Sequence, residues 1–330
     1  MNRRSPPRLT LVFVVALSTI ACGGSRAPTQ PTGPNPEQAR AYLDQLIGLM
    51  QANSINRLTI DWNSFRTTVF GQAAGAQTIS DTYPAIRVAL GLLGDGHSSY
   101  QASTGVVIYV PNRSCSASGG STPTLPVTIG YIKVGAFSGS GAQATTFADG
   151  IQRAIISADR DDLIGWIVDV RGNGGGNMWP MIAGVGPVLG EGLVGYFIDP
   201  TGVESPWVYR DGASWLSGYV QQRVTAPYRL RRDRPRVAVL TDNGIASSGE
   251  ATVVAFRQRQ DTRSFGTPTC GLSTANRSFP MSDGATLNLT VSVMADRTRA
   301  MYGDSIVPDE IVTDPGQLVQ RAMAWLNSGS

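Results

Sequence analysis

The sequence contains very few side chains that could act as a base near neutral pH. Among its 330 residues are one histidine, His97, and one lysine, Lys133. A serine nucleophile needs a partner that accepts its proton near pH 7, usually a histidine and sometimes a desolvated lysine. Lys133 lies in a strand-like stretch, where we expect its side chain to face solvent. For a serine hydrolase, His97 is therefore the expected base.

Cysteine is almost as scarce, with Cys22, Cys115 and Cys270. No pair of cysteines or histidines has the spacing of a zinc site, and we predict neither a metal nor a cofactor. In an oxidising compartment Cys115 and Cys270 would form a disulfide, and two buried free thiols are the alternative. The choice between them depends on where the protein is located.

The sequence has no apolar run long enough to span a bilayer. Residues 9–21 are apolar but too few to span a bilayer. A basic segment precedes them, and Cys22 follows them directly. This order resembles a bacterial lipoprotein signal, in which the cysteine is lipidated. We therefore predict a signal peptide at residues 1–21, lipidation of Cys22 and a flexible tether at residues 22–35.

These predictions place the protein in the bacterial cell envelope, anchored by its lipid and facing the periplasm or the exterior. Thr19 stands where lipoprotein signals usually have leucine. An ordinary signal peptide, cleaved near Ala21, is therefore the alternative.

An excess of either charge is also missing from the mature chain. The sequence has 27 basic and 24 acidic side chains, and Arg3, Arg4 and Arg8 account for the net charge of +3. All three lie in the predicted signal peptide, so the remaining chain is neutral overall. This balance predicts no nucleic-acid partner, and we expect contact with the membrane through the lipid anchor only.

Hydrophobic periodicity predicts two regions after the tether, a helical region at residues 36–100 and an α/β core at residues 101–330. In the first region, apolar residues recur at helical spacing after Pro36, around Trp62 and from Ser80 to Leu93. In the second region, strand-like and helix-like segments alternate. The predicted strands are 106–110, 129–134, 163–170, 236–241 and 287–294, and the predicted helices are 142–158, 247–258 and 314–326.

Ser247 and His97 both lie where a catalytic side chain could be exposed. Ser247 follows a buried strand and opens a helix, so free backbone N–H groups and the helix dipole would favour an oxyanion beside it. The alternative is that Ser247 only caps this helix, with Glu250 completing a capping box. His97 lies among glycines and serines just after a helix, which is not the apolar setting of a core histidine.

A third segment, residues 168–177, is a glycine-rich loop that follows another buried strand. Glycines let the backbone approach a ligand closely and turn its N–H groups outward, so this loop could supply an oxyanion donor. It lacks the spacing of a phosphate-binding or dinucleotide-binding loop. A plain tight turn is the alternative.

Taken in order, these segments resemble the tail-specific (C-terminal processing) serine protease family, whose fold is shared with crotonase-like proteins. The matching stretches are residues 93–98, 129–132, 167–176, 246–250, 266–271 and 307–309. The resemblance implies an α/β, crotonase-like protease core behind a small helical N-terminal region. It also implies that Ser247 is the nucleophile. The oxyanion hole would be formed by the backbone N–H groups of Ser248 and of Gly174 or Gly175.

The chain departs from many members of this family in two ways. Leu272 stands where they carry a catalytic lysine, and the segment around His97 instead resembles the histidine-using branch. That branch includes nisin-resistance proteins, tricorn core proteins and retinoid-binding relatives. Second, only about thirty residues separate Tyr100 from Tyr131, too few for the PDZ domain that many members carry.

We therefore predict an exported serine peptidase, in which His97 takes the proton of Ser247 and the substrate is a peptide or protein. The sequence leaves open whether a third residue orients the imidazole. Asp304 is one candidate, and the alternative is a dyad of Ser247 and His97 with no third residue. Two further functions remain as alternatives at this point. One is a non-catalytic ligand-binding protein on the same fold, and the other is an esterase or amidase for small molecules.

Overall fold

The computed structural model describes residues 35–117 and 122–328. The predicted signal peptide, Cys22 and residues 22–34 of the tether lie outside the described residues. Within the part of the chain that is described, no helix combines the length and the apolar character needed to cross a membrane.

Three helices form the N-terminal region, and their starts follow from local capping. They are α1 (Pro36–Asn53), α2 (Trp62–Gln72) and α3 (Tyr83–Leu93), with a short 3₁₀ turn η1 (Ser80–Thr82) before α3. The side chain of Asn35 accepts the Gln38 N–H at the start of α1, and Asp61 accepts two backbone N–H groups at the start of α2. The predicted helical region is confirmed.

A five-stranded parallel sheet forms the centre of the core. Its spatial order is β13-β10-β9-β4-β3, and all four of its pairings are parallel. Every residue of the central strands β4 and β9 is buried, as expected of parallel strands covered on both faces. The strands are β3 (Ile129–Lys133), β4 (Gly165–Asp169), β9 (Val237–Thr241), β10 (Thr262–Gly266) and β13 (Glu310–Ile311).

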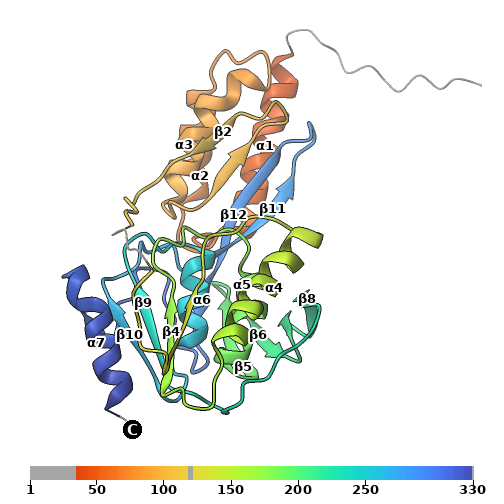
Figure 1. Ribbon diagram of the computed structural model, residues 1–330. Coiled ribbons are helices and arrows are strands. Elements are labelled where there is room, and N and C mark those ends of the chain that lie inside the picture. The colour runs from red at the N-terminus through yellow and green to blue at the C-terminus, as the bar shows by residue number, and fades with distance from the viewer. Residues whose placement is uncertain (1–34, 118–121, 329–330) are drawn as a thin grey trace, which may run out of the picture.

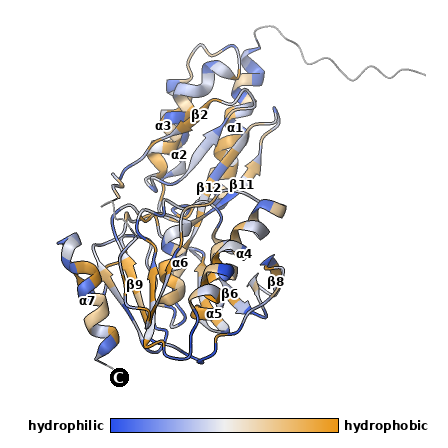
Figure 2. Ribbon diagram, in the orientation of Figure 1, coloured by the Kyte–Doolittle hydropathy of each residue, from blue (hydrophilic) through white to orange (hydrophobic). Residues whose placement is uncertain are grey.

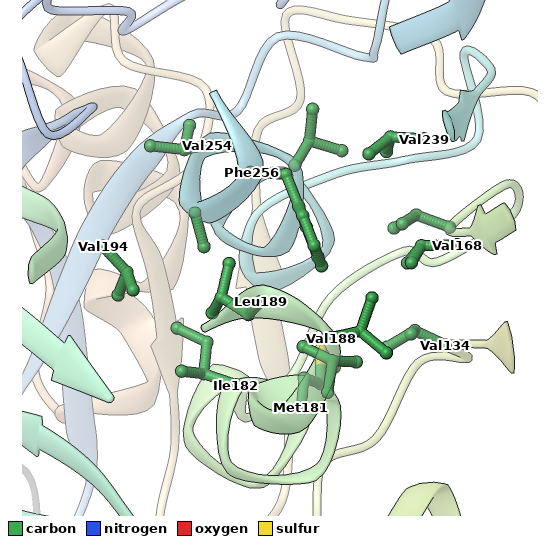
Figure 3. Packing of buried hydrophobic residues seen from close by; sticks show 14 of the residues in the cluster. Val134, Val168, Met181, Ile182, Val188, Leu189, Val194, Val239, Val254 and Phe256 are labelled. Atoms are coloured by element: carbon green, nitrogen blue, oxygen red, sulfur yellow. The ribbon is translucent and has the colours of Figure 1, made fainter. Parts of the chain in front are cut away.

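Helices cover both faces of this sheet. On one face, α7 (Pro315–Asn327) packs through Leu318, Ala322 and Leu326. On the other face lie α4 (Gly141–Ala158), α5 (Met178–Leu189) and α6 (Ser248–Phe256). Figure 3 shows side chains from β4, β9, α5 and α6 meeting in this second layer, the largest apolar cluster of the core.

An antiparallel sheet of eight strands extends from the core to the N-terminal helices. Its order is β2-β1-β12-β5-β6-β7-β8, and β11 also pairs with β12. Sequence patterns did not predict β5 to β8, β10 or β11, in part because strands such as β8 are almost entirely exposed. The strands are β1 (Ser99–Gln101), β2 (Val107–Tyr109), β5 (Gly192–Ile198), β6 (Glu204–Arg210), β7 (Ala213–Leu216), β8 (Tyr219–Arg223), β11 (Thr274–Pro280) and β12 (Thr286–Ala295).

The two regions are joined by strands from distant parts of the chain. The hairpin β11–β12 reaches up to α1 in Figure 1, and β12 pairs with β1. Leu287 and Leu289 of β12 share one apolar cluster with helix residues such as Leu46 and Ile86. Strand β1 crosses the expected boundary at residue 100, so β1 and β2 pack with the helices and not within the core. The predicted mixed α/β architecture is otherwise confirmed.

Candidate active site

Ser247 lies at the carboxyl edge of the parallel sheet, at the N-terminus of α6. Its backbone has φ 53° and ψ −119°, a conformation that non-glycine residues rarely adopt and that costs on the order of 1–3 kcal/mol. From Gly244 to Phe256, Ser247 is the only residue that is not buried. The strained turn therefore presents this one hydroxyl-bearing residue to solvent while the rest of the segment packs into the core.

Glu250 ties the Ser247 turn to a second segment. Its buried carboxylate accepts the Ser247 N–H at 2.9 Å, and it also accepts the Gly271 and Leu272 N–H groups, each at 2.8 Å. The Thr269 hydroxyl donates to it at 2.5 Å. Burial raises the pKa of Glu250 to about 7, against the opposing effect of these four donors. Ser247 and Glu250 thus form the capping box that was the alternative role of Ser247, and Glu250 is at the same time part of a larger network.

The glycine loop packs directly against Ser247. A Cβ on Gly175 would lie 2.8 Å from the Ala246 carbonyl oxygen and 2.9 Å from Ser247 Cβ, and its φ is 104°. Asn173 joins the two loops, because its carbonyl oxygen accepts the Ala246 N–H at 3.0 Å. The same oxygen would be 2.1 Å from a Cβ on Gly249. Glycine is therefore required on both sides of this contact.

The same contacts distinguish the two candidate oxyanion donors of the loop. The Gly175 N–H donates to Asn173 Oδ1 at 3.0 Å, so it is already used within the loop. Gly174 has open space around its Cα, with no atom within 4 Å of an added Cβ. The Ser248 hydroxyl donates to the Gly176 carbonyl at 2.7 Å, which holds the start of α6 against the loop. Gly174 and Ser248 are then the pair of backbone N–H groups that remain for a ligand.

His97 is held by a tight turn at the end of α3. Asp95 Oδ1 accepts the backbone N–H groups of His97 and Ser98, at 2.8 and 2.7 Å. The imidazole Nδ1 is 2.7 Å from the Thr274 hydroxyl oxygen, at the start of β11. Burial lowers the pKa of His97 to about 4, with Asp95 opposing the shift. The ring is therefore neutral at pH 7 and oriented by a hydroxyl group.

The segment from Thr269 to Thr274 links the two predicted catalytic side chains. Its first part binds Glu250, which binds the Ser247 N–H, and its last residue binds the His97 ring. Among the described residues, no hydrogen bond joins the imidazole to Ser247 itself. In unliganded serine hydrolases the bond between nucleophile and base is often long and tightens only with substrate.

One expectation about an individual residue differs from the structure. The Asp304 carboxylate pairs with Arg113 at 2.8 Å, and it is Thr274 that bonds to His97 Nδ1. Lys133 is exposed, as expected, with 42% of its side chain accessible. Its Nζ also donates to the Arg171 carbonyl at 2.7 Å and lies 3.3 Å from Asp169.

The two cysteines among the described residues are joined in the structure. Cys115 and Cys270 form a disulfide with a Cα separation of 5.1 Å, across 155 residues of sequence. Cys270 lies between Thr269 and Gly271, both of which bind Glu250. The disulfide therefore anchors the segment that carries the Glu250 and His97 contacts.

Comparison with known proteins defines the class first. A solved structure described as a lipoprotein from Streptococcus agalactiae has the same fold, with a TM-score of 0.70 over 92% of this chain and all of the other, at 19% identity. The photosystem II D1 C-terminal processing protease gives a TM-score of 0.56 over 84% of this chain and 93% of the other, at 14% identity. This chain thus shares its fold with a C-terminal processing protease.

Sequence comparison then defines the family. The model of peptidase family S41 matches residues 128–312, and the chain belongs to this family. The nisin-resistance protein of Lactococcus lactis subsp. lactis is 24% identical over 320 residues, which cover 97% of this chain and 96% of the relative. The carboxyl-terminal-processing protease of Synechocystis sp. is 26% identical over 57% of this chain, which spans 39% of that relative. The predicted family and fold are confirmed.

Two residues of the site had no signal in the sequence. Thr274 is an ordinary threonine at the start of an unpredicted strand, 177 residues from His97. Asn173 was seen only as part of a glycine-rich loop, but its side chain also donates to the Val134 and Gly135 carbonyl groups. Both roles depend on contacts between distant segments.

Proposed function

We propose that this protein is an exported serine peptidase in which Ser247 attacks a peptide carbonyl and His97 is the general base. The observation that carries the proposal is the position of Ser247. From Gly244 to Phe256 it is the only residue that is not buried, and it packs against the glycine loop at Gly175. This arrangement supports a nucleophile placed beside backbone donors.

In this mechanism His97 Nε2 takes the proton from Ser247 and later donates it to the leaving amine. Thr274 acts as a positioning residue, because its hydroxyl bonds Nδ1 and leaves Nε2 to face the reaction. Burial lowers the pKa of His97, so the ring is in its neutral form at pH 7, which is the form a general base requires. Thr274 thus takes the place proposed from sequence for Asp304.

The oxyanion would be stabilised by the backbone N–H groups of Ser248 and Gly174. The Gly175 N–H is directed to Asn173 Oδ1 and supports the loop instead. Ser248 is buried at the start of α6, and the exposed Gly174 lies in a loop that the Asn173 side chain ties to the Val134 and Gly135 carbonyl groups. These contacts would hold both donors in place as charge develops on the substrate oxygen.

The cellular setting belongs to the same proposal. Residues 1–21 would be a signal peptide, Cys22 would carry the lipid, and the domain would act at the bacterial cell envelope on peptides or proteins. The full-length likeness to a nisin-resistance protein and the fold shared with a streptococcal lipoprotein support this setting and the histidine-using branch. A disulfide at Cys115 and Cys270 fits an oxidising compartment.

Covalent labelling by a fluorophosphonate tests the assignment directly. We expect wild-type protein to be labelled at Ser247 and to cleave a peptide library, as read by mass spectrometry. Ser247→Ala removes the attacking oxygen, and His97→Ala removes the base. Both variants should lose labelling and cleavage by at least about a thousandfold while keeping the wild-type circular dichroism spectrum.

A pair of variants at one position supplies the matched control. Thr274→Val removes the hydroxyl bonded to His97 at nearly constant volume and should slow labelling, whereas Thr274→Ser should restore it. Cleavage that persists in Ser247→Ala would overturn the peptidase mechanism. A wild-type protein that is not labelled and cleaves nothing would instead support a ligand-binding role on this fold.

A further inference from the structure

The segment between β8 and β9 is unusually basic for a chain of balanced charge. Five of the eight residues from 229 to 236 are arginines, and Asp233 is the only acid among them. Figure 2 shows this segment as a continuous hydrophilic loop along the end of the core away from α1, α2 and α3. It precedes β9, so it lies at the amino end of the strand whose carboxyl end leads to Ser247.

This loop lines a cavity of about 660 Å³ that is separate from the candidate active site. The other walls come from the C-terminal end of α5 and the two residues after it, from Tyr209 of β6 and Tyr228, and from residues 259, 260 and 297. Its charged lining consists of five arginines and two acids: Arg229, Arg232, Arg234, Arg259, Arg297, Glu191 and Asp233. The cavity therefore has an excess of three positive charges.

Most of these arginines have no carboxylate partner. Arg229 lies 3.8 Å from Glu191 and 3.5 Å from Asp211, and its side chain is 82% exposed. Among the described residues, no ion pair includes any of the other four cavity arginines. An unpaired guanidinium on a surface is ordinary, but a buried one normally has a counter-charge.

Two of the unpaired arginines are largely withdrawn from solvent. Arg259 is only 8% exposed, and its Nε and Nη1 donate to the Leu189 carbonyl, the Gln260 carbonyl and the Thr262 hydroxyl. Within the described part of the chain, its Nη2 has no acceptor. Arg297 donates from Nη2 to the Ala255 carbonyl, and its buried Nε has no hydrogen-bond partner. Each residue thus retains N–H groups that the protein does not satisfy.

Capping of helix ends accounts for only part of this arrangement. Leu189 ends α5 and Ala255 lies in the last turn of α6, so each arginine satisfies a free carbonyl at a negative helix end. The two cations still repel each other: burial and the neighbouring Arg297 lower the pKa of Arg259 to about 10, with Asp261 opposing the shift. Burial also lowers the pKa of Arg297, and Asp296 opposes it. A bound anion would offset this repulsion and accept the remaining N–H groups.

We propose that this cavity binds a phosphate group, held by Arg259 and Arg297 from within and by Arg232 and Arg234 from the loop. A phosphate has several acceptor oxygens and up to two negative charges, which match forked guanidinium donors on more than one side. The group could come from a soluble phosphate or from a phospholipid headgroup. The proposal is independent of catalysis at Ser247, since the site lies at the opposite end of α6.

Titration calorimetry with inorganic phosphate tests the site, in the Ser247→Ala protein so that turnover plays no part. We expect saturable binding at constant ionic strength and a higher melting temperature in phosphate than in chloride. Arg234→Gln changes an exposed side chain and should weaken phosphate binding on the order of tenfold or more, as expected for one charge-assisted hydrogen bond. Arg297→Gln should weaken it at least as much.

Arg231→Gln is the matched control, because Arg231 lies in the same loop but pairs with Asp161 and does not line the cavity. It should bind phosphate as wild type does. Sedimentation with phosphatidylglycerol vesicles, compared with phosphatidylcholine, distinguishes the source: binding that requires Arg234 but not Arg231 supports a headgroup. Absence of both phosphate and vesicle binding, or an equal loss in Arg231→Gln, would overturn the proposal.

Discussion

At the scale of single residues, the site depends on side chains whose surroundings change their ordinary chemistry. His97 is kept neutral by burial and oriented by Thr274, while Ser247 is held in a strained backbone conformation by Glu250. Both arrangements reduce the reorganisation that a reaction would require. Burial of an ionisable group also has a measurable cost in stability.

His97 should make the folded protein less stable in acid. Its pKa is about 4 in the folded state and near the ordinary imidazole value of 6.5 when unfolded, so the unfolded chain binds the proton first as the pH falls. The stabilising effect of a neutral His97 is therefore present above about pH 6.5 and is lost as the pH falls toward 4. We expect the free energy of unfolding of wild type, minus that of His97→Asn, to decrease across this range.

Urea unfolding of both proteins between pH 4 and 8 measures this difference. Subtracting the free energy of unfolding of the variant from that of wild type removes the contribution of other groups that titrate in the same range, including Glu250. A difference that stays constant with pH would show that the imidazole is not buried in its neutral form.

At the scale of elements, the site is formed where two strand-to-helix loops meet at the carboxyl edge of the parallel sheet. The loop after β4 and the loop after β9 contact each other through Asn173, Gly175 and Ala246. Neighbouring parallel strands bring such loops together whatever the sequence distance between them. The closeness of this contact leaves no room for a side chain.

Gly175→Ala should therefore disable the site, whereas Gly174→Ala should not. A Cβ at Gly175 would meet the Ala246 carbonyl and Ser247 Cβ below 3.0 Å, and alanine is strained at φ 104°. Displacing Ser247 by even about 1 Å can cost on the order of a hundredfold in rate. At Gly174 there is open space and the backbone N–H is retained.

Fluorophosphonate labelling rates and urea unfolding of the two variants provide the measurement. We expect at least a hundredfold slower labelling for Gly175→Ala, and labelling within about tenfold of wild type for Gly174→Ala. Equal rates in both variants would mean that the loop does not position Ser247 as described.

At the scale of the whole molecule, distant segments hold the two regions and the site together. Strand β12 pairs with β1 and packs on α1, and the Cys115–Cys270 disulfide connects the loop before β3 to the segment that binds Glu250. The strand pairing and packing exist only in the folded state, whereas the disulfide also restricts the unfolded chain.

Removing the disulfide should lower stability and loosen the site. With 155 residues between the cysteines, the double variant Cys115→Ser, Cys270→Ser should lose about 2–5 kcal/mol of unfolding free energy. Urea unfolding measures this loss, and wild type treated with dithiothreitol should match the variant. If reduction leaves wild type unchanged, the two thiols are not joined in the protein as isolated.

Local patterns in the sequence were enough for much of the fold. Buried parallel strands read as continuous apolar runs, and helices such as α3 and α7 have strong apolar faces and clear starts. Exposed antiparallel strands such as β8 carry little periodic signal, because hydrogen bonds to neighbouring strands define them and burial does not.

The sequence by itself determined the family and named one candidate nucleophile and one candidate base, because a single histidine and an ordered set of short motifs left few choices. Only the tertiary structure decided that Thr274, and not Asp304, contacts His97 and that five arginines line one cavity. These contacts join residues far apart in the chain. Which distant side chains meet depends on how the strands pair and pack, and no local pattern records that.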